Sequence, residues 1–274
     1  MNKISVCSWI FGDQPIEKTI RTIDSLGYQS IEIAASEAVN QTSKIKSILK
    51  DTDLIIGGMT GDASWPDETK DLSNHNSDYR NKAVSYFQEQ IKTAGELAAD
   101  YIVICPSAVG KITSPIEKDE NWQRALDSVK KLSETAAAED IDLIIEPINR
   151  YESSLLNSAN DACRFVSEIK HTNVKMLVDT FHMNLEEEDL IQAIFDSADQ
   201  LAVFHVADNN RKGLGMGHLD FPAIFTALKT IQYDGPVVLE CLVPSGSPFE
   251  ANSSKNLQLT EYLKSSLKIL NQYI

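Results

Sequence analysis

The sequence contains few cysteines and no long apolar run. Its four cysteines, in a chain of 274 residues, lie far apart, and none forms a Cys-x-x-Cys pair. Widely separated cysteines in a chain of this length are typical of reduced thiols rather than of a disulfide framework. No uninterrupted apolar stretch approaches the roughly 20 residues that a membrane-spanning helix requires, and the amino terminus shows no secretory leader pattern. We therefore expect a cytoplasmic protein that has no membrane partner.

Basic residues are also scarce. The chain has 25 Lys and Arg against 40 Asp and Glu, which gives a formal net charge of −15. Nucleic-acid binding relies on clustered Lys and Arg that neutralise phosphates, so this charge argues against nucleic acid as the main partner. The charge still permits a small anionic substrate in a locally basic pocket, and it favours solubility.

Short β-branched runs alternate with amphipathic segments along the whole chain. The apolar runs predict strands at 4–7, 30–34, 54–56, 101–105, 142–145, 175–179, 201–205 and 236–240, the third ending at Gly57-Gly58. Helical spacing follows each of them, at 15–26, 43–50, 79–99, 122–138, 159–169, 190–198, 221–231 and 257–270. Strands that alternate with helices indicate a parallel sheet, and about eight such units in ~250 residues is the size of a (β/α)₈ barrel. We predict one α/β domain over residues 1–274, a single (β/α)₈ TIM barrel. An open doubly wound sheet is the alternative, disfavoured because no Gly-x-Gly-x-x-Gly follows the first strand.

The last four predicted strands end in groups that can bind a metal. These groups are Glu146, Asp179, His205 and Glu240. Because the carboxyl ends of barrel strands converge on one mouth, we expect the four side chains to meet there. Carboxylates combined with an imidazole suit Mn²⁺, Mg²⁺ or Co²⁺, with positions left open for a substrate. Each residue also has a plain structural interpretation, such as Asp179 capping the turn that follows it. Their equivalent positions on consecutive strands favour the metal site.

Several other segments near these strand ends have two interpretations. Arg211 offers a fixed cation for substrate oxygens, or it pairs with surface acids. Trp9 and Phe11 either line a pocket or fill the core. The acidic run 186–188 is expected to form the first turn of a helix. Residues 59–76 are expected to form a long irregular loop, whose role the sequence does not assign.

The sequence around these residues resembles a known family. The similar strings are Glu146-Pro-x-Asn-Arg-Tyr-Glu152, Val178-Asp-Thr-Phe-His-Met-Asn184-x-Glu186, His205-x-x-Asp-x-Asn-Arg211 and Gly215-x-Gly217-x-x-x-Phe221. Over residues 142–245 the chain resembles the xylose-isomerase-like TIM barrel superfamily of sugar isomerases and epimerases. More narrowly, it resembles the ketose 3-epimerases of the D-tagatose/D-psicose group. Ala207-Asp208, where that group commonly has Gly-Glu, resembles the related keto-sugar-acid epimerases linked to inositol catabolism.

The resemblance implies a metal-dependent isomerase of carbohydrate metabolism. It implies a divalent metal, Mn²⁺ first and Mg²⁺, Co²⁺ or Zn²⁺ as alternatives, bound by the four strand-end residues Glu146, Asp179, His205 and Glu240. It also implies sugar contacts from Glu152, His182 and Arg211, and a homodimer or homotetramer.

The predicted reaction is inversion of C3 in a ketose or keto-sugar acid. A weakly acidic α-proton is removed only when a Lewis acid stabilises the enediolate that forms. Two carboxylates on opposite faces of the substrate must then remove and return the proton. We assign this acid/base pair to Glu146 and Glu240.

Other functions remain open. An aldose–ketose or hydroxypyruvate-type isomerase uses the same enediolate, and an inosose-type dehydratase adds a β-elimination. An AP-endonuclease-like nuclease is disfavoured by the charge of −15 and by Gly57-Gly58 and Pro106-Ser107, which stand where middle-strand histidines are needed. A non-catalytic sugar-binding barrel is disfavoured by the complete ligand set. The sequence does not determine the sugar, whether it is phosphorylated, or the roles of Asn149 and Arg150.

Overall fold

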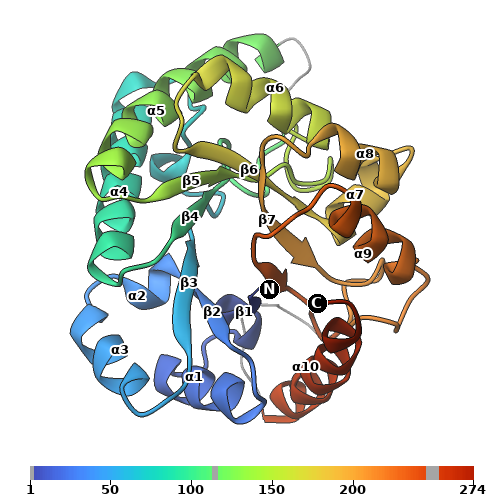
Figure 1. Ribbon diagram of the computed structural model, residues 1–274. Helices are drawn as coiled ribbons and strands as arrows, with labels where there is room; N and C mark the ends of the chain where they lie inside the picture. Colours follow the sequence, from blue (N-terminus) through green and yellow to red (C-terminus); the bar gives the residue numbers. More distant parts are fainter. Residues whose placement is uncertain (1–2, 113–116, 245–252) are drawn as a thin grey trace.

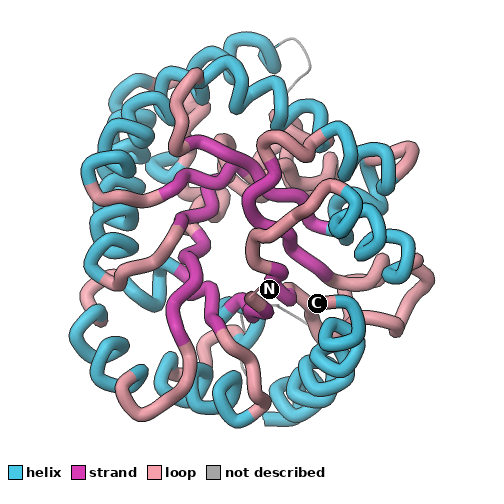
Figure 2. The backbone as a smooth tube through the Cα atoms, viewed as in Figure 1, coloured by secondary structure: helices cyan, strands magenta, loops and turns pink. Residues whose placement is uncertain are grey.

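A computed structural model describes residues 3–112, 117–244 and 253–274. Over these residues the strands form a closed parallel barrel in the order β1 to β8, and β8 pairs with β1. The helices surround the strands (Figure 1), and the backbone trace shows the strands as an inner ring with the helices outside it (Figure 2). The predicted (β/α)₈ barrel is confirmed.

The observed elements follow the predicted alternation closely. The strands are β1 (Ile4–Cys7), β2 (Ser30–Ala34), β3 (Ile55–Thr60), β4 (Tyr101–Ile104), β5 (Asp142–Ile145), β6 (Val174–Asp179), β7 (Leu201–Val206) and β8 (Val237–Leu239). The longer helices are α1 (Ile16–Ser25), α3 (Thr42–Leu49), α4 (Ser77–Glu96), α5 (Lys118–Ala138), α6 (Ala159–Ile169), α9 (Phe221–Thr230) and α10 (Ser253–Tyr273). The short ones are η1 (Ser8–Phe11), α2 (Ala35–Ala38), η2 (Glu68–Lys70), α7 (Thr180–Glu186) and α8 (Leu190–Asp196).

The barrel strands are apolar because both of their faces are covered. Side chains fill the inside of the barrel, and the helices pack on the outside. Every residue of β1 and of β4 is accordingly buried. Helix α1 buries Ile16, Ile20 and Ile23 on one face, as its spacing predicts. Within the described ranges, no helix has the length and apolar character needed to cross a membrane.

The predicted end of the third strand is wrong. Strand β3 continues through Gly57 and Gly58 and ends at Thr60. A Cβ atom on Gly58 would lie 2.2 Å from the Tyr101 ring, and one on Gly57 would lie 2.4 Å from the hydroxyl oxygen of Ser30. The two glycines therefore leave room for side chains of the neighbouring strands, instead of breaking the strand. The same observation shortens the predicted irregular loop, because residues 59–60 belong to β3.

The acidic run 186–188 does not form the first turn of a helix. Helix α7 begins directly after β6, because the Asp179 carboxylate accepts a hydrogen bond from Phe181 N at 2.8 Å and caps it. Glu186 is consequently the last residue of α7. It pairs with Arg150 at 2.7 Å, so one of the two residues left unassigned by the sequence has a structural partner.

Candidate active site

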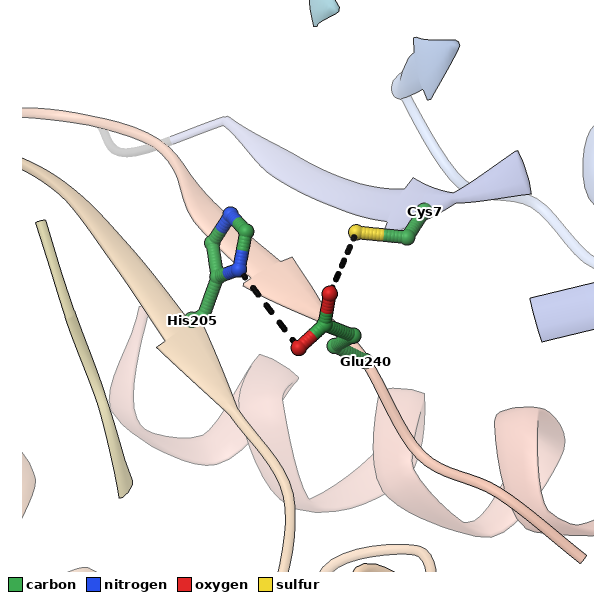
Figure 3. Close-up of side chains that lie close together, drawn as sticks. All are labelled: Cys7, His205 and Glu240. Atoms are coloured by element: carbon green, nitrogen blue, oxygen red, sulfur yellow. Dashed lines mark hydrogen bonds and ion pairs between the residues drawn. The ribbon is translucent and has the colours of Figure 1, made fainter. Parts of the chain in front are cut away.

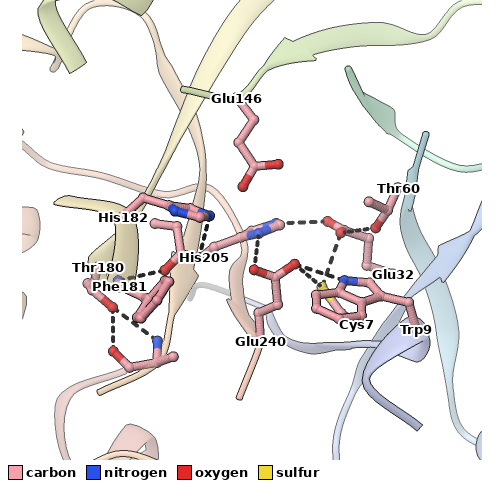
Figure 4. A network of polar contacts seen from close by, with 12 residues as sticks. Cys7, Trp9, Glu32, Thr60, Glu146, Thr180, Phe181, His182, His205 and Glu240 are labelled. Atoms are coloured by element: carbon pink, nitrogen blue, oxygen red, sulfur yellow. Dashed lines mark hydrogen bonds and ion pairs between the residues drawn. The ribbon is translucent and has the colours of Figure 1, made fainter. Parts of the chain in front are cut away.

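The four strand-end residues lie together at the mouth of the barrel. Glu146 follows β5, Asp179 ends β6, His205 lies near the end of β7, and Glu240 follows β8. One potential ligand atom from each lies within 4.8 Å of the others, and all four residues are buried. In Figure 4 the side chains of Glu146 and Glu240 point toward one another from opposite sides of the site, with His205 between them. The structure thus brings together the residues that the strand-end pattern selected.

Asp179 combines a structural role with an open donor atom. Its Oδ1 accepts the Phe181 N–H that starts α7. Its Oδ2 is buried and has no hydrogen-bond partner among the described residues; Nε2 of His182 lies 3.8 Å from it. The helix-capping interpretation and the ligand interpretation therefore apply to different oxygens of the same carboxylate.

His205 is oriented by Glu32, a residue that was not predicted from the sequence. Nε2 of His205 lies 3.2 Å from Oε2 of Glu32. Glu32 is fully buried in β2 and also accepts hydrogen bonds from Tyr101 at 2.7 Å and Thr60 at 2.6 Å. An imidazole that donates Nε2–H to a carboxylate keeps its lone pair on Nδ1, the arrangement usual for a metal-binding histidine. Nδ1 of His205 is buried and has no hydrogen-bond partner in the described part of the chain.

Glu240 is held by an aromatic donor and a guanidinium. Trp9 donates its Nε1–H to Oε1 at 2.8 Å, and Arg211 donates to Oε2 at 3.0 Å. Trp9 therefore contributes to the site, whereas Phe11 is fully buried in the core. The sequence had left both interpretations open for these two aromatic residues.

In the protein without a bound cation, the pKa values of the two glutamates lie far apart. Burial and the neighbouring Glu240 raise the pKa of Glu146 well above its usual range. Burial also opposes ionisation of Glu240, but His205 and Arg211 outweigh it and lower the Glu240 pKa. Burial and Glu240 raise the pKa of Asp179 to about 7. The three carboxylates cannot all ionise at low cost unless further positive charge is present.

A divalent cation fits this set of donors. It would supply the missing positive charge, and two members of the group have a buried atom without a hydrogen-bond partner in the described residues, Asp179 Oδ2 and His205 Nδ1. Oxygen donors with one imidazole nitrogen suit Mn²⁺ and similar ions of intermediate character.

Arg211 lies at the edge of this group, next to a second predicted substrate residue. Its guanidinium is 3.6 Å from Oε1 of Glu152. The guanidinium carbon is 4.6 Å from the Phe181 ring centroid and 5.7 Å from that of Trp9. Cation–π contacts with two rings restrict the orientation of the guanidinium, so Arg211 is held toward the mouth rather than free on the surface.

His182 is a neutral donor facing the site. Its Nδ1 accepts a hydrogen bond from Asn149 N at 3.2 Å, which places the ring proton on Nε2. Burial and the nearby Arg211 lower the pKa of His182 to about 3. The Asn149 side-chain amide also donates to Glu152 at 2.8 Å. Asn149, to which the sequence assigned no role, therefore positions both His182 and Glu152, two of the predicted substrate-binding residues.

The loop after β7 is organised by a buried carboxylate. Asp208 accepts hydrogen bonds from Gly217 N at 2.8 Å and Leu219 N at 3.2 Å. A Cβ atom on Gly217 would lie 2.3 Å from Oδ1 of Asp208, so this glycine leaves room for the carboxylate. Gly215, with φ +77°, provides the sharp bend expected of the glycine-rich loop.

Two thiols lie beside the glutamates. Sγ of Cys7 is 3.2 Å from Oε1 of Glu32 and 3.7 Å from Oε1 of Glu240. Sγ of Cys105 is 3.8 Å from Oε2 of Glu146. All four cysteines are free. Neither thiol was predicted as a site residue, although each stands at or directly after the end of a predicted strand.

Several known proteins of similar sequence and structure are sugar epimerases. A family model described as xylose isomerase-like TIM barrel matches residues 20–269. The 3-dehydro-D-guloside 4-epimerase of Escherichia coli K12 is 30% identical over 260 residues, covering 91% of this chain and 95% of the relative. The D-psicose 3-epimerase of Ruminiclostridium cellulolyticum is 30% identical over 239 residues, covering 85% and 80%. A crystal structure of D-psicose 3-epimerase with D-tagatose from Clostridium cellulolyticum H10 has a TM-score of 0.89 and 26% identity, covering 99% of both chains.

Proposed function

Because the chain belongs to the xylose isomerase-like TIM barrel family and is an enzyme of the sugar epimerase and isomerase class, we propose that it inverts C3 of a ketose or keto-sugar acid. Glu146 and Glu240 are the proposed acid/base pair. The observation that carries this proposal is the buried group Glu146, Asp179, His205 and Glu240, whose donor atoms lie within 4.8 Å of one another.

The proposed cofactor is a divalent cation, with Mn²⁺ as the first choice. Glu146, Asp179, His205 and Glu240 would hold it. When bound, such a cation supplies Lewis acidity that stabilises negative charge on the substrate oxygens as the α-proton leaves. The protein supplies the proton transfers and the orientation of the sugar.

Glu146 and Glu240 are proposed to move the proton between the two faces of the sugar. Their side chains point toward one another from β5 and β8 (Figure 4). One of them takes the α-proton from one face of the sugar, and the other returns a proton to the opposite face. The two roles exchange in the reverse direction.

Arg211, Glu152 and His182 are proposed to hold the sugar. Arg211 and Glu152 lie next to each other at 3.6 Å, so they offer a donor and an acceptor to neighbouring hydroxyl groups. His182 offers Nε2–H from a neutral ring, which can bind a sugar oxygen without adding a competing charge. The three residues thereby fix which carbon faces the two glutamates.

Inversion at C4 of a 3-keto glycoside is a second candidate. A relative that is 30% identical and covers 91% of this chain carries the name 3-dehydro-D-guloside 4-epimerase. A C4 proton next to a C3 ketone is acidified in the same way as a C3 proton next to a C2 ketone. The same residues therefore serve either reaction, and the substrate-binding residues decide between them.

Turnover in D₂O tests the proposed proton transfer. Because two different carboxylates remove and return the proton, the product is expected to carry one solvent deuterium at the inverted carbon. The label is expected at C3 with a ketose or keto-sugar acid, and at C4 with a 3-keto glycoside. ¹H NMR of the purified product locates it, and incubation without enzyme corrects for spontaneous exchange. A fully protonated inverted carbon in the product would refute both candidates.

Removal of the cation is expected to lower thermal stability. A ligand at about 100 times its Kd stabilises the folded state by roughly 2.7 kcal/mol. In a protein of this size, 1 kcal/mol corresponds to about 2–4 °C in Tm, so Mn²⁺ added to chelator-treated protein is expected to raise Tm by roughly 5–10 °C. Differential scanning calorimetry measures the shift. An effect of Mn²⁺ no larger than that of Na⁺ at equal ionic strength would contradict the proposed metal site.

A further inference from the structure

Cys7 forms a second possible coordination group with two residues of the proposed site. It is the last residue of β1, and it lies within 4.8 Å of ligand atoms of His205 and Glu240. Figure 3 shows Glu240 between the other two side chains, with one carboxylate oxygen directed toward each. The Cys7 sulfur is 3.7 Å from Oε1 of Glu240, and Nδ1 of His205 is 3.8 Å from Oε2.

The group of Cys7, His205 and Glu240 includes a sulfur donor. The proposed catalytic group, Glu146, Asp179, His205 and Glu240, offers only oxygen and nitrogen donors. A thiolate, an imidazole and a carboxylate are the ligands that Zn²⁺ and softer divalent ions prefer, whereas Mg²⁺ and Mn²⁺ prefer oxygen. Glu32 orients the His205 ring for metal binding, because Oε2 of Glu32 lies 3.2 Å from Nε2 of the ring. Its Nδ1, buried and without a hydrogen-bond partner in the described residues, remains available to a ligand.

We propose that Cys7, His205 and Glu240 form a binding site for thiophilic divalent cations, Zn²⁺ or Cd²⁺, that overlaps the proposed catalytic site. The ion replaces the proton of the Cys7 thiol, which is released to solvent, and the sulfur becomes a thiolate ligand. Because the two groups share His205 and Glu240, occupation of one excludes occupation of the other. A thiophilic ion therefore displaces Mn²⁺ from contact with Glu146 and Asp179.

This inference rests on the proposed function in two consequences, which are the displacement of Mn²⁺ and the inhibition of turnover that follows from it. The binding itself is measured without a substrate. Full-length protein freed of metal is titrated with Cd²⁺, and the ultraviolet difference spectrum is recorded. Wild-type protein is expected to develop a thiolate-to-cadmium charge-transfer band that saturates at one ion per chain. Carboxylate and imidazole ligands alone give no such band.

Cys7→Ser is expected to abolish the band and to weaken Cd²⁺ binding at least about tenfold, while Mn²⁺ affinity changes by less than about threefold. Cys105→Ser is the matched control, because Cys105 lies 3.8 Å from Glu146 but does not belong to the group with His205. It is expected to keep the band. Cys7→Ala is measured as well, in case the serine variant does not fold, as judged by circular dichroism.

The outcomes separate this inference from the proposed function. A band that is missing from wild-type protein, or that survives in both Cys7 variants, overturns the thiolate site whatever the enzyme does with sugars. A band that depends on Cys7 supports the site even if no epimerase activity is found with Mn²⁺.

Discussion

Glu146→Gln and Glu240→Gln are each expected to lower kcat by about 10²- to 10⁴-fold while the protein remains folded. Glutamine has nearly the size of glutamate and keeps a carbonyl oxygen, but it can neither accept nor return the α-proton. Both side chains are buried at the mouth of the barrel. Steady-state kinetics at saturating Mn²⁺, over ketohexoses, ketopentoses, 5-keto-hexonic acids and 3-keto glycosides, measures the loss.

The two variants are expected to retain different half-reactions. Each glutamate serves one face of the sugar, so the remaining glutamate still removes a proton from its own face. In D₂O, Glu146→Gln should exchange the α-proton of one epimer without inverting it, and Glu240→Gln that of the other. Glu152→Gln is the control, because Glu152 is proposed to bind the sugar; it should raise KM more than it lowers kcat. Near-normal kcat in either of the first two variants would defeat the assignment.

The residues found from the sequence are those that end apolar strands. Glu146, Asp179 and Glu240 each come directly at or after the last residue of a strand. A closed barrel places all of these ends at one mouth, so strand order and strand ends suffice to predict that the side chains meet. The distances of a few ångströms at which these side chains could hold a metal ion together depend on side-chain packing, which the pattern does not contain.

The residues not found from the sequence come from the first strands or from contacts across the barrel. Glu32 lies in the middle of β2, and His205, its partner, is 173 residues away. The only local signal for Glu32 is a carboxylate between Ile31 and Ile33 in an otherwise apolar strand, where burial of an unpaired charge is costly. The prediction that the third strand ends at Gly57 and Gly58 was wrong for a related reason. The side chains that occupy the space beside these glycines, where a Cβ atom would lie, belong to neighbouring strands.

Glu32→Leu is expected to destabilise the metal-free protein by about 3–5 kcal/mol. Burial opposes a charge on His205, but Glu32 and Glu240 outweigh it and raise the His205 pKa, so the change removes one partner of a buried ionic pair. Glu32 is fully buried and receives the hydrogen bonds of Tyr101 and Thr60 in addition to that of His205. Leucine fills the space but leaves these donors without an acceptor. At about 2–4 °C per kcal/mol, the expected fall in Tm is roughly 6–20 °C. Calorimetry of metal-free protein measures it without interference from cation binding.

The same variant is expected to weaken Mn²⁺ binding by about 10- to 100-fold, because the group that orients a metal-binding histidine controls its affinity. Without Glu32 the His205 ring is free to carry its proton on Nδ1, the nitrogen that faces Glu240 at 3.8 Å. Glu32→Gln is the matched variant. Its carbonyl oxygen can still accept hydrogen bonds from Tyr101 and His205, so this variant should recover most of the stability. If the orientation of His205 rather than the charge of Glu32 controls the affinity, it should also recover most of the Mn²⁺ binding. Isothermal titration calorimetry on both variants separates the two causes. A Glu32→Leu protein that binds Mn²⁺ as wild type does would show that His205 keeps its orientation without this carboxylate.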